Sequence, residues 1–137
     1  MKNLNLIVIL ILINFSDATE KTILFLYNAE DDFPSIVEDF IHKSISPNTY
    51  PCQLCKLTYG TFYKKKQWRE FLSNLNYSYK FVYRNNDVNI NYHGNQYPII
   101  LFGNLENNEV LVSTDELNAC QTVEDLIEII INKLKEN

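Results

Sequence analysis

The chain is organised around the stretch Ser46-Pro47-Asn48-Thr49-Tyr50-Pro51-Cys52-Gln53-Leu54-Cys55-Lys56-Leu57-Thr58-Tyr59-Gly60. Two of the three cysteines of the protein lie in it, separated by two residues. The proline before the first cysteine suits the entry to a helix, and leucines follow at helical spacing. We therefore expect the chemistry of this protein, if it has any, at Cys52 and Cys55.

The residues before this stretch predict a strand followed by a helix. Lys21–Tyr27 is a continuous apolar run with β-branched and aromatic members, which is typical of a strand buried on both faces. Apolar residues then recur at helical spacing from Phe33 to Ile41, after an aspartate that can cap the helix. Pro47 cannot continue this helix, so we expect it to end near Lys43 or Ser44.

The residues after the cysteine stretch predict a helix, three strands and a closing helix, with an asparagine-rich loop before the second of these strands. The order β-α-α-β-β-β-α pairs two parallel strands through a helical crossover and ends in an antiparallel hairpin and a helix. This is the plan of the thioredoxin fold, a four-stranded mixed sheet with helices on both faces, and a C-x-x-C near a βαβ pattern agrees with it. The predicted elements are a helix at Trp68–Leu75, strands at Tyr79–Arg84, Tyr97–Phe102 and Val110–Ser113, and a helix that Thr122 and Asp125 cap in a variant of the capping box.

The first 18 residues predict an export signal rather than a part of the fold. A positively charged start is followed by a nearly continuous apolar run, Leu4–Phe15, and then by the small residues of Ser16-Asp17-Ala18. The apolar run is shorter than the ~20 residues that span a membrane, although an uncleaved anchor or a buried strand is an alternative. The mature chain would then be one domain, residues 19–137, in a periplasmic or secreted location where disulfides persist.

Three pieces of sequence resemble a family of small bacterial proteins. The pieces are His42-Lys43, Ser46-Pro47-Asn48-Thr49-Tyr50 and Cys52–Gly60, where the family pattern is HK, then SPxTY, then CxLCxLT followed by His or Tyr and Gly. The resemblance extends from about Ile23 to the final helix. It implies a thioredoxin-like domain, in which a cis proline at the start of the third strand lies beside the cysteines, and Pro98 is the candidate. Some relatives carry the label GTPase, but this chain has no phosphate-binding G-x-x-x-x-G-K-[ST] motif.

The first functional hypothesis is thiol–disulfide exchange with a protein substrate. Such exchange needs a thiolate and a nearby resolving thiol, which two cysteines one helical turn apart supply. Cys52 would attack, Cys55 would resolve, and Pro98 would shape the substrate groove, while a helix N-terminus and Lys56 would favour the thiolate form of Cys52. The alternative is a structural disulfide that closes a turn.

Two further hypotheses use other properties of the chain. Cys52 and Cys55 could bind zinc or copper, with His42, His93 or Cys120 as possible completions, although none stands at a diagnostic spacing. The protein could also be a non-enzymatic binding module, in which the Lys64–Lys66 run meets an anionic partner or is simply a solvated face. The net charge of -5 argues against nucleic-acid binding, and we expect no bound cofactor and no membrane contact beyond the N-terminal segment.

Overall fold

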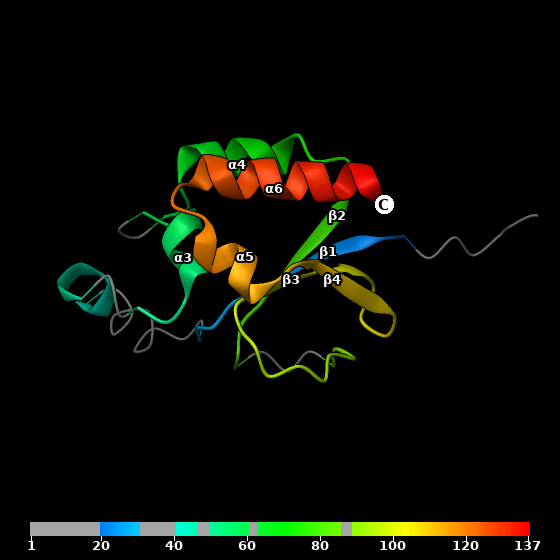
Figure 1. Ribbon diagram of the computed structural model, residues 1–137, viewed down its shortest axis with the longest axis horizontal. Helices are drawn as coiled ribbons and strands as arrows, with labels where there is room; N and C mark the ends of the chain where they lie inside the picture. The colour runs from blue at the N-terminus through cyan, green and yellow to red at the C-terminus, as the bar shows by residue number, and fades with distance from the viewer. Residues whose placement is uncertain (1–19, 31–40, 47–49, 61–62, 86–88) are drawn as a thin grey trace, which may run out of the picture.

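The computed structural model describes residues 20–30, 41–46, 50–60, 63–85 and 89–137. Four strands of this part form one mixed sheet in the order β2-β1-β3-β4 (Figure 1). β1 is parallel to β2 and antiparallel to β3, and β3 is antiparallel to β4. The predicted strands and the terminal hairpin are confirmed to within a few residues. The strands are β1 (Thr22–Leu26), β2 (Ser78–Val82), β3 (Ile99–Gly103) and β4 (Asn108–Val112).

Strand β1 lies between β2 and β3 in the sheet. Its side chains are therefore buried on both faces, as its apolar run predicts. Successive side chains of a strand point to opposite faces. Ile23 and Phe25 belong to the larger buried cluster of the protein. Leu24 and Leu26 belong to a smaller cluster that also includes Leu101 of β3.

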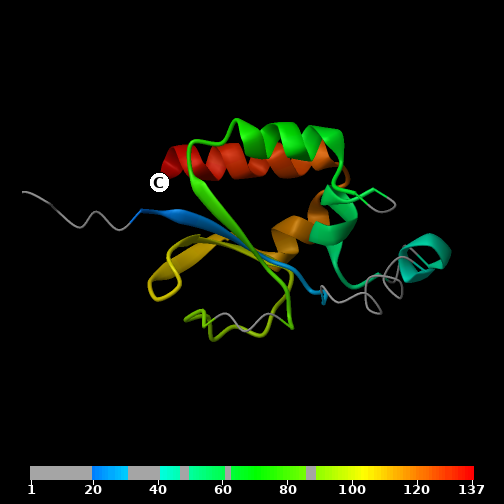
Figure 2. The same ribbon diagram turned by 180° about the vertical axis from the view of Figure 1, so that it is seen from behind.

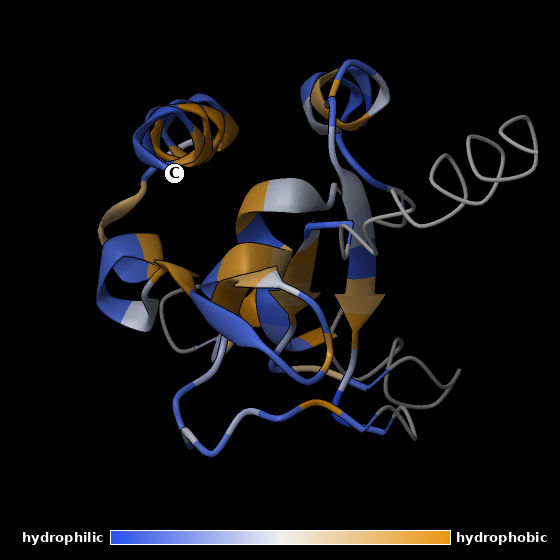
Figure 3. Ribbon diagram, turned by 90° about the vertical axis from the view of Figure 1, so that its right-hand side faces the viewer, coloured by the Kyte–Doolittle hydropathy of each residue, from blue (hydrophilic) through white to orange (hydrophobic). Residues whose placement is uncertain are grey.

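Among the described residues, the helices α3 to α6 pack on one face of the sheet, the face of Ile23 and Phe25 (Figures 1 and 2). In Figure 3 the hydrophobic residues of α6, which ends at the label C, lie on the side turned toward the rest of the protein. Each helix contributes buried side chains to the same cluster. The helix predicted after β1 lies mostly outside the described residues, so helices on both faces of the sheet stay a prediction. The helices are α3 (Gln53–Thr58), α4 (Lys66–Ser73), α5 (Thr114–Ala119) and α6 (Val123–Glu136).

Loop residues pack on the opposite face of the sheet. Ile90, Tyr92 and Leu105 pack against the smaller cluster. The connection between β2 and β3 runs beneath the sheet in Figure 2. This connection is rich in asparagine and lacks an apolar stripe at helical spacing, so it was predicted as a loop, and its described residues contain no helix.

Both C-terminal helices begin with a capping box. Thr122 and Asp125 cap α6 reciprocally, which confirms the predicted start of the closing helix. Ser113 and Glu116 do the same for α5, a short helix that was not expected from the sequence. A six-residue helix is hard to detect by periodicity, but Ser-x-x-Glu after a strand is a recognisable signal.

Two predictions fall partly or wholly outside the described residues. The export signal at residues 1–18 and the start of the helix predicted after β1 cannot be compared with the structure. Residues 41–45 are helical, so that helix ends within two residues of the predicted position. Among the residues described, no helix is both long and apolar enough to cross a membrane.

Candidate functional site

Cys52 and Cys55 form a disulfide bond, with sulfur atoms 2.07 Å apart. Cys52 is the N-cap residue of α3, and its Sγ accepts a hydrogen bond of 3.2 Å from the backbone N–H of Cys55. The pair is shielded from solvent, because Cys52 is 0% exposed and Cys55 is 7% exposed. The two cysteines singled out from the sequence therefore meet, in the oxidised state and beneath the surface.

The cysteine helix is attached to the end of β1 through Thr58. Thr58 Oγ1 donates to the carbonyl oxygen of Leu54 and lies 3.3 Å from the hydroxyl of Tyr27, which directly follows β1. Since the single hydroxyl proton of Thr58 goes to Leu54, the Tyr27 hydroxyl is the donor in the second bond. Both Thr58 and Tyr27 are fully buried, so this pair joins α3 to the sheet inside the core.

Lys43 connects the preceding helical residues to the other end of α3. Its Nζ donates to the carbonyl oxygens of Tyr59, at 2.7 Å, and Gly60, at 3.2 Å. A cation at this end of a helix also meets the negative end of the helix dipole. Burial lowers the pKa of Lys43, and the nearby Lys65 and Lys56 lower it further.

The motif residues that precede the cysteines also contact each other. The His42 ring packs edge-on against the Tyr50 ring, with centroids 5.6 Å apart. Asn28, which follows the end of β1, donates a hydrogen bond of 3.2 Å to the carbonyl oxygen of Pro51. The ring contact joins two separated parts of the motif, and the Asn28 hydrogen bond connects the residue before Cys52 to the chain that follows β1.

Tyrosines gather at the carboxyl ends of the parallel strands β1 and β2. The Tyr27 and Tyr83 rings stack with centroids 5.1 Å apart, and the hydroxyls of Tyr59 and Tyr83 are hydrogen-bonded at 2.9 Å. Burial raises the pKa of Tyr27 well above its usual value. Sequence reasoning missed this cluster because Tyr27 and Tyr83 fall within the runs that predict the two strands. Beside it is a pocket of about 240 Å³ lined by Leu26, Tyr27, Val82, Tyr83, Arg84, Ile90, Tyr92 and Tyr97.

Pro98 lies at the same end of the sheet, beside the carboxyl end of β1. Its peptide bond with Tyr97 is cis, the conformation that the resemblance implied. The register pairs Leu26 with Ile99, so Pro98, one residue earlier, stands opposite the residue that follows β1. Pro98 is buried, and its carbonyl oxygen accepts a hydrogen bond of 2.8 Å from Thr114 Oγ1.

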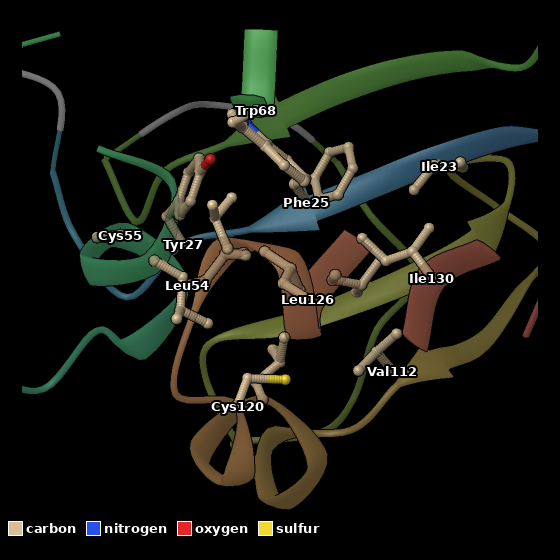
Figure 4. Close-up of a cluster of buried hydrophobic side chains, with 14 of the residues drawn as sticks. Ile23, Phe25, Tyr27, Leu54, Cys55, Trp68, Val112, Cys120, Leu126 and Ile130 are labelled. Carbon is tan, nitrogen blue, oxygen red and sulfur yellow. The ribbon is translucent and has the colours of Figure 1, made fainter. Parts of the chain in front are cut away.

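Cys120 is a buried free thiol at the C-cap of α5. Its carbonyl oxygen accepts a hydrogen bond of 2.8 Å from the side chain of Gln53, between the paired cysteines, and its Sγ donates to the carbonyl oxygen of Glu116. Burial raises the pKa of the Cys120 thiol, and Asp125 and Glu116 raise it further. Figure 4 shows Cys120 in the same buried cluster as Tyr27, Leu54 and Leu126.

The proposed metal ligands are not gathered into a site. Among the residues described, no three His, Cys, Asp or Glu side chains lie close enough together to hold a metal ion. His42 packs on Tyr50, His93 is exposed, and the two cysteine sulfurs are bonded to each other. The described geometry therefore offers no third ligand for the cysteine pair.

Comparisons of the chain with protein-family models, with curated proteins and with solved structures found no match. The role of the cysteine pair must therefore be inferred from its own surroundings. Those surroundings are the first turn of α3, the buried Thr58 and Tyr27 pair, and Pro98 at the same edge of the sheet.

Proposed function

We propose that this chain is an exported thioredoxin-like protein whose Cys52–Cys55 pair exchanges with the thiols and disulfides of other proteins. The observation that carries the proposal is the hydrogen bond from the Cys55 N–H to Cys52 Sγ. When the pair is reduced, the same N–H can donate to a thiolate on Cys52, and hydrogen bonds to charged groups are stronger than bonds to neutral ones. The thiolate is the form that attacks disulfides.

The arrangement of the sheet supports a thioredoxin-like interpretation. The sheet contains a parallel pair, β1 and β2, and a terminal antiparallel hairpin, β3 and β4, and both are parts of the plan expected from the sequence. The cysteine helix is tied to the end of β1, and Pro98 lies at that edge. Ligands of open α/β sheets bind outside the carboxyl ends of the parallel strands, which favours this edge as the place of chemistry.

The exchange proceeds in two steps. In the reduced protein, the Cys52 thiolate attacks one sulfur of a substrate disulfide, so that a Cys52–substrate bond forms and the other substrate sulfur leaves as a thiolate that takes up a proton. Cys55 then loses its proton and attacks Cys52, which restores the intramolecular disulfide and releases the second substrate thiol. The protein is oxidised by two electrons and the substrate is reduced by two, and the reverse sequence oxidises a substrate dithiol.

The burial of the pair favours a second candidate, a structural disulfide in a non-enzymatic domain. Cys52 has no exposed surface, so a substrate sulfur can reach it only after the neighbouring chain moves aside. The gain in stability from such a disulfide would be small, because a short closed loop constrains the unfolded chain less than a long one. In this case the pair would stiffen the first turn of α3 and take no part in exchange.

Reduction under native conditions separates the two candidates. We use Cys120→Ser as the background, so that every thiol detected comes from the pair. Exchange predicts that glutathione reduces the disulfide while the protein stays folded, and that a limiting alkylating agent then modifies Cys52 before Cys55. A disulfide that opens only in urea, together with an inactive protein in a disulfide-reductase assay, would leave only the structural role.

Cys52→Ser and Cys55→Ser provide matched variants in the same background. If exchange occurs, Cys55→Ser should trap a mixed disulfide through Cys52, while Cys52→Ser should be inactive. Export is tested separately by the N-terminal sequence of protein recovered from cells, which is expected to begin at Thr19.

A further inference from the structure

The charges of this acidic protein are unevenly distributed along the chain. Residues 41–86 contain eight of the 12 lysines and arginines but only one of the 17 aspartates and glutamates, Glu70. These residues form α3, α4 and β2, and β2 is one edge of the sheet. The acidic residues from Glu106 onward lie on and around α5, α6 and β4, and β4 is the other edge strand. The eight basic residues are Lys43, Lys56, Lys64, Lys65, Lys66, Arg69, Lys80 and Arg84.

Four of these lysines, Lys43, Lys56, Lys64 and Lys65, meet around the end of α3 and are called the basic surface below. Burial lowers the pKa of Lys43, and the charges of Lys65 and Lys56 lower it further. The Lys65 N–H donates to the carbonyl oxygen of Thr58, the last residue of α3, at 2.8 Å. Lys64 Nζ lies 4.0 Å from the centroid of the Phe81 ring on β2. All four side chains are partly exposed.

Hydrogen bonds connect the basic surface to the cysteine pair over about one helical turn. The carbonyl oxygen of Cys55 accepts from the N–H of Tyr59 at 3.0 Å, and the carbonyl oxygen of Tyr59 accepts from Lys43 Nζ at 2.7 Å. Lys56 directly follows Cys55 in the chain. One turn of helix rises about 5.4 Å, so a substrate sulfur that approaches the pair comes within the unscreened range of these charges at low salt.

We propose that the basic surface selects polypeptide substrates that carry acidic residues beside the cysteine to be exchanged. This inference rests on the proposed function. A positive surface raises the association rate of anionic partners. A polypeptide is favoured over a nucleic acid because exchange requires a sulfur in the partner and because the acidic half of the protein would repel an extended polyanion.

The test measures exchange between the reduced protein and three peptide disulfides that differ only in the residues flanking the cysteine, which are glutamate, serine or lysine. At low ionic strength we expect the glutamate peptide to react about 10-fold faster than the serine peptide and the lysine peptide to react most slowly. In 1 M salt, where charges are screened beyond ~3 Å, the three rates should converge.

The variant Lys56→Gln/Lys65→Gln should reduce the ratio of the glutamate rate to the serine rate to about 3-fold or less. The matched control, Lys21→Gln/Lys135→Gln, removes two lysines outside the basic surface and should leave the ratio unchanged. Because the ratio compares two substrates of one protein, it is insensitive to any change in the reactivity of the cysteines themselves.

Each remaining outcome overturns the inference in a recognisable way. Equal rates for all three peptides would refute the role of the basic surface while leaving exchange intact. No reaction with any peptide would remove the proposed function and this inference together. Tighter binding of a single-stranded oligonucleotide than of the glutamate peptide, lost in Lys56→Gln/Lys65→Gln, would assign the surface to nucleic acid.

Discussion

Replacing Thr58 by valine should destabilise the protein because it leaves the Tyr27 hydroxyl buried without an acceptor. Thr58 and Tyr27 are both 0% exposed, and their hydroxyl oxygens are 3.3 Å apart. Valine has nearly the shape of threonine, so no cavity contributes to the effect. An unsatisfied buried polar group costs about 1–3 kcal/mol, and we expect Thr58→Val to lower the free energy of unfolding by that amount.

The second variant, Tyr27→Phe, makes this prediction specific. Thr58 still donates to the Leu54 carbonyl oxygen in Tyr27→Phe, so this change should cost no more than about 1 kcal/mol. The double variant Thr58→Val/Tyr27→Phe removes both polar groups and should be more stable than Thr58→Val alone, since removing both partners of a buried hydrogen bond is less costly than removing one. Tyr79→Phe, at a tyrosine that is 41% exposed, is the control and should change stability by less than about 0.5 kcal/mol.

Urea unfolding of the oxidised proteins, followed by fluorescence and circular dichroism, measures these free energies. A double variant whose loss of stability equals or exceeds the sum of the two single losses would refute the reasoning, because it would mean that the two hydroxyls do not depend on each other. A loss in Tyr79→Phe as large as that in Tyr27→Phe would equally show that burial of the hydroxyl is not the cause.

The same tyrosine predicts how stability depends on alkaline pH. Burial raises the pKa of Tyr27 in the folded protein above the value of 10.0 in an exposed tyrosine. The folded state therefore retains a proton that the unfolded state loses, so this contribution to stability is fully present below pH ~10 and decreases as pH rises beyond it. Tyr27→Phe should flatten the decline in unfolding free energy measured between neutral pH and pH ~11.

Three other changes have defined outcomes. Gly103 has a φ of 138° and its added Cβ would collide with the Asn107 backbone, so Gly103→Ala should cost about 1–3 kcal/mol in urea unfolding, whereas Gly60→Ala should be nearly neutral. Hydrogen bonding to Lys133 lowers the pKa of Glu116. The stability that the Glu116 carboxylate contributes is therefore present above pH ~4.5 and is lost as pH falls through the lowered pKa. Glu116→Gln should make the unfolding free energy fall less steeply in an acid titration. Cys120 is buried with a raised pKa, so a thiol reagent should modify it in the oxidised protein only on unfolding.

Much of the fold could be predicted from local patterns in the chain. The apolar run of β1 indicates a strand buried on both faces, and the structure confirms both the strand and its central position. Thr122 and Asp125 mark the start of α6 because a capping box is formed by residues three apart. The C-x-x-C spacing singles out a pair that does form a disulfide. In each case the interaction involves neighbours in sequence, or a burial pattern that one segment contains by itself.

Tertiary structure decided the features that join distant segments. Among the described residues, the helices α3 to α6 bury side chains on the Ile23 and Phe25 face of the sheet, and loop residues pack on the other face. In the sequence Thr58 is one polar residue at the end of a helical segment, yet it receives a hydrogen bond from Tyr27, 31 residues earlier. Such contacts depend on the packing of whole elements, which no local spacing encodes.

The candidate site divides in the same way. The sequence by itself determined that Cys52 and Cys55 are the candidate site, because their spacing alone allows them to form a disulfide. Only the tertiary structure decided that Cys52 is fully buried and that Lys43 lies at the far end of the cysteine helix. Exposure and charge around a sulfur are sums over every segment packed near it, so they follow from the completed fold rather than from any one stretch.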